Sequence, residues 1–285
     1  MTYTTLISAQ ALRAHGQDPD WVIVDCRHDL MNPLAGEMAY REGHLPRAYF
    51  AHLDTMLSGE KLDAAGVFKG RHPFPDRTAL IQTLRAWGVH ESTQLIAYDA
   101  QSGMFAARLW ALLRWLGHAR VAVLDGGLPA WLASGGELVK DIPEVAQGTI
   151  VAKPALLATV EANTVLENIQ HPVFTLVDAR APDRFRGENE TIDPHGGHIP
   201  GAKNRFFKDN LQADGCFKPA EQLREAWLGI LPDPAKAVMQ CGSGVTACHN
   251  LLALEIAGLG GGALYPGSWS EWCADEGRPI AKGNE

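Results

Sequence analysis

The feature that most constrains the fold is an internal duplication. Residues 95–135 align without a gap with residues 236–276, at an offset of 141 positions. The alignment matches glycines and tryptophans across the two copies, pairing Gly103 with Gly244, Gly126 with Gly267 and Trp131 with Trp272. A repeat of this length gives each copy enough chain for its own core, so it predicts two sibling domains rather than a solenoid. The length of 285 residues also favours two domains.

Within each copy, short apolar runs alternate with segments of helical spacing. The first copy predicts strands at 21–25, 95–98 and 121–124 and helices at 9–12, 76–87, 104–116 and through Trp131. The second copy repeats the pattern, with one strand that ends at Asp178 and another at 237–239. Such alternation predicts an α/β fold in which each domain has a mostly parallel sheet with helices on both faces. We place the N-terminal domain at 1–142, a proline-containing linker at 143–157 and the C-terminal domain at 158–285.

One loop of the second copy carries a cysteine that the first copy lacks. Cys241-Gly242-Ser243-Gly244-Val245-Thr246 follows an apolar run and precedes a helical pattern, which predicts a strand, a tight loop and a helix start. Gly242 and Gly244 can take positive φ angles, so consecutive amide N–H groups can surround an anion. The dipole of the following helix acts in the same direction. Because both effects favour a thiolate, and because position 100 of the first copy is Ala, Cys241 is the candidate nucleophile.

Other interpretations of this loop are weaker. Gly242-x-Gly244-x-x-Ala247 resembles a dinucleotide fingerprint, but residues 256–270 lack the acidic residue that such a site needs. A phosphate-binding loop would need a Lys after the last glycine. A cysteine phosphatase would place an Arg at position 247, where this chain has Ala. A buried cysteine with a purely structural role remains an alternative at this point.

Composition limits the partners and the compartment. The formal net charge of -8 argues against nucleic-acid binding. Five cysteines without a Cys-x-x-Cys pair predict reduced thiols. Without a long apolar segment or a signal pattern, we expect no membrane association and a cytoplasmic location. Asp193, His195 and His198 lack a fourth ligand at a standard spacing, so we expect no metal and no other cofactor.

Motifs that both copies share are better explained by the fold than by chemistry. The shared motifs are Asp-x-Arg at 25–27 and 178–180 and Gly-His-x-Pro at 43–46 and 197–200. We expect the first to form structural ion pairs and the histidines His44 and His198 to anchor loops. Arg184 and Arg186 occur only in the second copy, beyond the end of a strand, where they could bind an anionic substrate. The alternative for both arginines is a solvated surface charge.

Together these motifs resemble the rhodanese superfamily, specifically the tandem-domain sulfurtransferases. The resemblance covers nearly the whole chain and also includes Gly70-Arg71-His72-Pro73, Leu124-Asp125-Gly126-Gly127 and Arg184-Phe185-Arg186-Gly187. Within the family, Cys-Gly-Ser-Gly-Val-Thr looks like the mercaptopyruvate branch. Thiosulfate enzymes of the animal type carry basic residues at the positions of Gly242 and Ser243.

The resemblance implies a ping-pong mechanism. Cys241 would take sulfane sulfur from a small anionic donor, 3-mercaptopyruvate or thiosulfate, and pass it from a persulfide to cyanide or a thiol. The substrate-binding loop would comprise residues 242–246, with the Ser243 and Thr246 hydroxyls supporting the amides. Arg184 matches the arginine that binds the donor carboxylate. A reducing protein such as thioredoxin is a further expected partner.

The chain also departs from the family pattern. Mercaptopyruvate enzymes carry a second donor-binding Arg shortly before Gly-His-Ile-Pro, where this chain has Asp193-Pro194-His195. Arg186 or Arg71 could take the place of that arginine. The Ser-His-Asp relay of the mercaptopyruvate branch would map to Ser243 and His44, without a matching Asp. Two alternatives to a sulfurtransferase stay open, namely a non-catalytic sulfur carrier or interaction module and a cysteine-dependent phosphatase or arsenate reductase.

Overall fold

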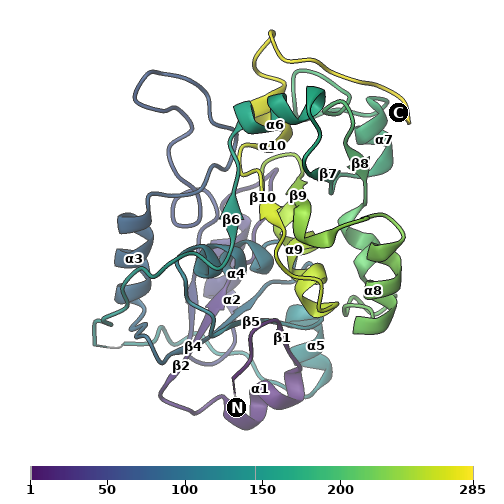
Figure 1. Ribbon diagram of the computed structural model, residues 1–285. Coiled ribbons are helices and arrows are strands. Elements are labelled where there is room, and N and C mark those ends of the chain that lie inside the picture. The colour runs from purple at the N-terminus through teal and green to yellow at the C-terminus, as the bar shows by residue number, and fades with distance from the viewer. Residues whose placement is uncertain (1, 145, 285) are drawn as a thin grey trace. The chain divides into compact units, whose positions relative to one another are not determined.

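The chain forms two compact units, which follow the two sequence copies except for two segments. The computed structural model describes residues 2–144 and 146–284 (Figure 1). Unit 1 contains the chain up to Gly59, Phe74–Leu156 and Gln212–Phe217. Unit 2 contains Glu60–Pro73, Leu157–Leu211 and the chain from Lys218 onward. A segment of the first copy, Glu60–Pro73, therefore belongs to the unit that holds Cys241. The boundaries drawn at 143–157 concern the sequence copies and stay a prediction.

Unit 1 is built on a five-stranded sheet in which every pairing is parallel. The strand order is β1-β5-β4-β2-β3. The strands are β1 (Leu6–Ile7), β2 (Trp21–Asp25), β3 (Ala48–Phe50), β4 (Gln94–Tyr98) and β5 (Val121–Leu124). The helices are α1 (Ala9–His15), α2 (Ala35–Glu42), α3 (Arg77–Ala86), α4 (Ala106–Trp115) and α5 (Gly127–Ala133).

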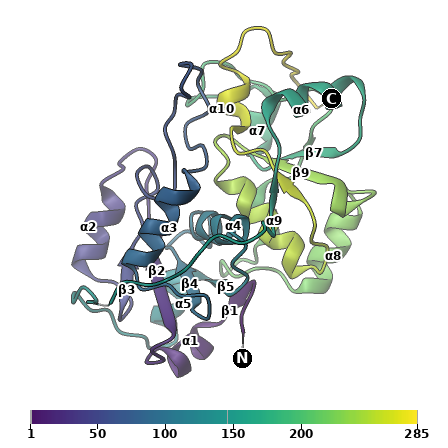
Figure 2. The same cartoon turned by 60° about the vertical axis from the view of Figure 1, so that its left-hand side comes forward.

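Both faces of this sheet are covered, which explains the continuous apolar strands. All five residues of β2 and of β4 are buried. Alternate strand residues, such as Ile23 and Ile96, share one core cluster with Leu12 of α1, Tyr40 of α2 and Trp131 of α5. Helix α4 also packs closely on the strands β4 and β5 (Figure 2). The α/β fold predicted from the apolar runs is therefore confirmed for this unit.

Unit 2 repeats the same topology with shorter strands. Its five-stranded parallel sheet has the order β6-β10-β9-β7-β8. The strands are β6 (Ala158–Thr159), β7 (Thr175–Asp178), β8 (Lys203–Asn204), β9 (Ala237–Gln240) and β10 (Ala263–Leu264). The helices are α6 (Ala162–Gln170), α7 (Pro182–Arg186), α8 (Ala220–Leu228), α9 (Thr246–Ile256) and α10 (Ser268–Trp272), with 3-10 turns η1 (Phe207–Asn210) and η2 (Pro234–Lys236).

The strand–loop–helix segment around Cys241 lies at the centre of unit 2. Strand β9 is the middle strand of the sheet, and its four residues are buried. Helix α9 is buried along Ala247–Leu254 and packs on β9, β10 and α8. The loop between β9 and α9 is therefore held by two fully packed elements at the carboxyl edge of a parallel sheet, where α/β folds bind ligands.

Some short elements carry no clear sequence signal. Helix α2 has Leu34 at its N-cap position and lacks a side-chain capping hydrogen bond, and α7 has only five residues. Strands β3 and β8 have three and two residues. Such elements are stabilised by tertiary contacts more than by local propensity. Among the helices of residues 2–144 and 146–284, none combines the length and the apolar character that a membrane crossing requires.

Candidate active site

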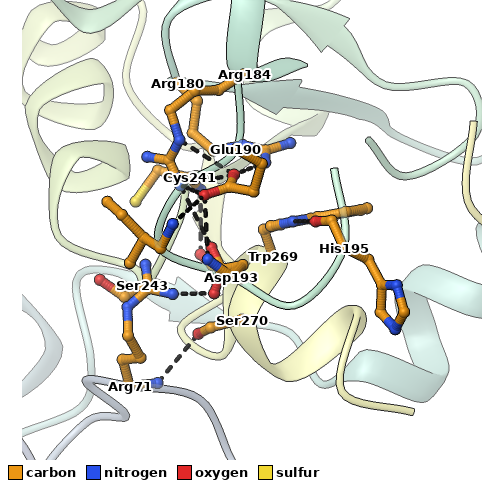
Figure 3. A network of polar contacts seen from close by, with 12 residues as sticks. Arg71, Arg180, Arg184, Glu190, Asp193, His195, Cys241, Ser243, Trp269 and Ser270 are labelled. Atoms are coloured by element: carbon orange, nitrogen blue, oxygen red, sulfur yellow. Dashed lines mark hydrogen bonds and ion pairs between the residues drawn. The ribbon is translucent and has the colours of Figure 1, made fainter. Parts of the chain in front are cut away.

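Cys241 follows the last residue of β9, as the sequence predicts. Its side chain is buried, with 2% of its surface exposed. Its amide N–H donates to Ser268 Oγ at 3.1 Å, and its carbonyl oxygen accepts from the Trp269 amide at 2.9 Å. The next carbonyl, of Gly242, accepts from the Ser270 amide at 2.9 Å. The start of α10 thus fixes the backbone on which the thiol is carried (Figure 3).

The two loop glycines have different roles. Gly244 has φ +74°, and a Cβ there would lie 2.3 Å from the Pro266 carbonyl oxygen, so this position requires glycine on both grounds. Gly242 does not adopt a positive φ, so the conformational freedom that the sequence offers at both glycines is used only at Gly244. The absence of a side chain matters there instead. A Cβ on Gly242 would lie 2.9 Å from Nη2 of Arg71 and 3.7 Å from both Nη atoms of Arg184.

The first copy shows that a loop of this kind can hold an anion. In unit 1 the carboxylate of Asp99 accepts from the amides of the loop between β4 and α4, at 2.9 Å from Gln101, 2.9 Å from Gly103, 2.8 Å from Phe105 and 2.9 Å from Ala106. In the second copy the residue at the position of Asp99 is Gln240. Neither polar atom of its buried side chain has a hydrogen-bond partner among the described residues. At the position where unit 1 has a carboxylate, unit 2 therefore has an uncharged amide side chain, followed by the thiol of Cys241.

Arg184 lies beside the loop, as predicted, and Arg71 joins it. Arg71 is about as exposed as Arg184, at 23% and 21% of the side chain. Arg184 forms a two-point pair with Glu190, with Nη2 2.9 Å from both carboxylate oxygens and Nε 3.1 Å from Oε2. Asp193 contacts both arginines, because Oδ1 pairs with Nη1 of Arg71 and Oδ2 lies 3.3 Å from Nη2 of Arg184. Arg184, Arg71 and two carboxylates thus form one network next to Cys241 (Figure 3).

The two acids of this network are perturbed in opposite directions. Burial raises the pKa of the Asp193 carboxyl above its ordinary value, while the neighbouring Arg71 opposes the rise. Burial also acts on Glu190, yet its pKa is lowered, because the amides of Ile192 and Asp193 and the Arg184 guanidinium favour the carboxylate. Glu190 is therefore the better stabilised anion of the two.

The histidine that contacts Ser243 is His72. Its Nδ1 lies 2.8 Å from Ser243 Oγ, and both side chains are buried. The sequence comparison assigned this role to His44, which is wrong. His44 belongs to unit 1, where Nδ1 lies 2.8 Å from the Tyr40 carbonyl oxygen and Nε2 lies 3.2 Å from that of Asp141. The signal that could have identified His72 is its place beside Arg71 in the Gly-Arg-His-Pro motif.

The remaining predicted residues fall into two groups. Val245 and Thr246 form the start of α9, with Val245 at the N-cap position. Arg186 is not brought to the loop, and pairs instead with Glu188 at 2.8 and 2.7 Å. All five cysteines are free, and the buried Cys248 donates to the Gly244 carbonyl oxygen at 3.2 Å, which agrees with a packed helix face.

The motifs shared by both copies are structural, as predicted. In each unit the arginine pairs with the buried aspartate two residues before it and donates to a glycine carbonyl oxygen, at 2.8 Å from Arg27 to Gly43 and 2.7 Å from Arg180 to Gly197. His198 bonds the Phe185 carbonyl oxygen at 2.9 Å and stacks on its ring. In unit 2, Nη1 of Arg180 also lies 3.5 Å from Oε2 of Glu190. The Asp178–Arg180 pair is therefore linked to the carboxylate that pairs with Arg184.

Comparison with known proteins identifies the family. Residues 8–134 and 161–275 match the family described as the rhodanese-like domain. The chain is 45% identical over 287 residues, covering all of both proteins, to a probable 3-mercaptopyruvate sulfurtransferase of Pseudomonas aeruginosa. It is 37% identical to a putative thiosulfate sulfurtransferase of Mycobacterium tuberculosis, over 98% of this chain and 97% of that protein.

Solved structures give the same result. A 3-mercaptopyruvate sulfurtransferase from Leishmania major superposes with a TM-score of 0.82 at 30% identity, covering 95% of this chain and 74% of that one. The two matched segments correspond to the two sequence copies, so the duplication is a tandem of like domains. The chain therefore belongs to the rhodanese family, as a tandem-domain sulfurtransferase of the 3-mercaptopyruvate/thiosulfate type.

Proposed function

We propose that Cys241 is the sulfur-accepting nucleophile. Its thiolate attacks the sulfane sulfur of the donor, forming an S–S bond while the bond from that sulfur to the donor breaks. With 3-mercaptopyruvate the broken C–S bond leaves its electron pair on carbon, and the resulting enolate takes a proton to become pyruvate. The observation that carries this proposal is the position of Cys241 at the end of β9, below a glycine loop and beside two arginines.

Arg184 and Arg71 support a donor with a carboxylate. Two guanidinium groups near one glycine can bind a carboxylate in two-point fashion. Ser243 of this loop and His72 form a hydrogen-bonded pair, which holds the proton that the enolate requires. We therefore favour 3-mercaptopyruvate over thiosulfate as the donor, in line with the names of the relatives from Pseudomonas aeruginosa and Homo sapiens.

The second half-reaction returns Cys241 to its starting state. A thiolate or cyanide attacks the terminal sulfur of the persulfide, takes that sulfur, and leaves the Cys241 thiolate. The physiological acceptor in this proposal is a small thiol protein such as thioredoxin. A reducing compartment such as the cytoplasm would keep all five thiols free, as they are in the structure.

The test compares Cys241→Ser with Cys248→Ser in the full chain. After exposure to mercaptopyruvate, intact mass should show one added sulfur atom in the parent and in Cys248→Ser, and none in Cys241→Ser. Steady-state transfer to cyanide should be lost only in Cys241→Ser. Persulfide formation with very slow turnover for every small donor would favour a sulfur carrier instead. Release of phosphate from an aryl phosphate would revive the phosphatase alternative, which Ala247 disfavours.

A further inference from the structure

A carboxylate already occupies the space between the two donor-binding arginines. Asp193 uses one oxygen for each, with Oδ1 on Arg71 and Oδ2 on Arg184. Its side chain is 3% exposed, so it is enclosed by the network rather than lying at its rim. Both guanidinium groups point at the position of a Gly242 Cβ, above the loop that carries Cys241. An internal carboxylate thus makes the contacts expected for the carboxylate of a donor (Figure 3).

The charges of the network are balanced without a substrate. Arg180 is paired with Asp178, Arg184 with Glu190, and Arg71 with Asp193. Arg180 lies against the Trp269 ring at 4.6 Å and donates to a glycine carbonyl, so it is held in place. Each of these three guanidinium groups therefore has a carboxylate partner. A donor carboxylate that binds both Arg71 and Arg184 must compete with one of the acids.

Asp193 is the weaker competitor of the two acids beside Arg184. Glu190 makes three contacts of 3.1 Å or less with that guanidinium and accepts two backbone amides. Asp193 makes one contact of 3.3 Å with it. Burial raises the pKa of Asp193, which means that its ionised form is held less favourably than that of Glu190. Asp193 also lies on a loop bounded by Gly187 and Gly197, both at positive φ.

We propose that Asp193 is a specificity-determining residue, an internal carboxylate that a carboxylate donor must displace from Arg71 and Arg184. The proposal rests on the donor site proposed above and adds to it. Asp193 lowers the affinity of the site for carboxylates and leaves the chemistry at Cys241 unchanged. A donor must therefore be present at high concentration, or must offer contacts beyond its carboxylate, to be used efficiently.

The test measures kcat and KM for mercaptopyruvate in Asp193→Asn, Asp193→Glu and Asp183→Asn. Asp183 is a partly exposed carboxylate on α7 that accepts from Asn189 and from the Arg184 amide, so its variant removes the same charge outside the network. We expect KM to fall by about tenfold in Asp193→Asn, equivalent to about 1.4 kcal/mol of competition, with kcat little changed. Asp193→Glu keeps a carboxylate and should keep the high KM, as should Asp183→Asn. Adding Arg71→Ala to Asp193→Asn should abolish the gain.

A second measurement separates this proposal from the proposed function. Pyruvate carries the donor carboxylate without the sulfur, and its binding can be followed by calorimetry in the Cys241→Ser background. Tighter pyruvate binding in Asp193→Asn would support the displacement even if no sulfur were transferred. A KM that stays equal or rises in Asp193→Asn, with folding intact by thermal melting, would show that Asp193 only holds the arginines in place. An equal fall of KM in Asp183→Asn would show that the effect comes from the loss of a negative charge and not from the contacts of Asp193. Either result overturns the proposal.

Discussion

At the scale of single residues, alanine substitutions at the two loop glycines should have different effects. One should strain the backbone, and the other should displace an arginine side chain. Gly244→Ala would place a side chain at φ +74°, against the Pro266 carbonyl oxygen at 2.3 Å. We expect a loss of about 1–3 kcal/mol of unfolding free energy and a displaced Cys241 loop. Gly242→Ala meets only the end of the flexible Arg71 side chain, at 2.9 Å. Its stability should change little, while KM for mercaptopyruvate rises because Arg71 moves.

The matched control for these variants is Gly201→Ala. Gly201 has φ +79°, and a Cβ there would have no heavy atom within 4 Å. The Gly201→Ala variant should therefore lose only the free energy needed to hold alanine at a positive φ, about 1 kcal/mol. Chemical denaturation and mercaptopyruvate kinetics of the three variants make the comparison. If Gly242→Ala left KM unchanged, the placement of Arg71 over the loop would be contradicted.

At the scale of elements, local sequence signals sufficed for part of the site. The apolar run of β9, the glycine loop and the helical pattern of apolar residues in α9 are adjacent in the chain, so their structure and the position of Cys241 could be predicted. Arg184 was accessible through its place after β7, where parallel sheets present ligand-binding residues.

The other half of the site is formed by residues that lie far apart in the sequence, and local sequence patterns do not predict such contacts. His72 and Ser243 are 171 residues apart, and Arg71 and Asp193 are 122 residues apart. Segment Glu60–Pro73 has no helix or strand, and its place in unit 2 depends on contacts such as the Lys69–Glu271 pair at 2.9 Å and the bond from the Arg71 amide to Ser270 Oγ at 3.0 Å. Without those contacts, His44 and His72 are equivalent candidates on sequence alone.

The same segment yields a prediction about proton transfer. If His72 and Ser243 hold the proton for the enolate, His72→Gln should lower kcat for mercaptopyruvate by about a hundredfold. Thiosulfate releases sulfite, which needs no proton on carbon, so its turnover should change far less. Kinetics with both donors provide the measurement, and His44→Gln is the structural control. A parallel loss for both donors would mean that His72 only positions the loop.

At the scale of the whole molecule, the duplication left two related loops with different side chains at their first positions. In unit 1 the Asp99 carboxylate takes four loop amides and position 100 is Ala, whereas the second copy has Gln240 and Cys241. Ser102 has φ 58°, a conformation that Ser243 does not share, so the loops are not identical. Among the differences between the two loops, two neighbouring positions bear directly on the chemistry, because Asp99 supplies a carboxylate in unit 1 and Cys241 supplies a thiol in unit 2.

This asymmetry predicts that restoring the cysteine alone does not create a second nucleophile. In Ala100→Cys, in a Cys241→Ser background, the Asp99 carboxylate would keep the amides and repel a thiolate beside it. In Asp99→Gln/Ala100→Cys the carboxylate is replaced by the side chain that the second copy has at Gln240. We expect alkylation of the thiol at position 100 to be at least about tenfold faster in the double variant, since the thiolate is the reacting form. The alkylation rates are measured by peptide mass spectrometry, and thermal melting confirms that both variants are folded. Equal alkylation rates would mean that the Asp99 carboxylate does not suppress the reactivity of a thiol at position 100. The reactivity of Cys241 would then depend on Arg71, Arg184 and His72 instead.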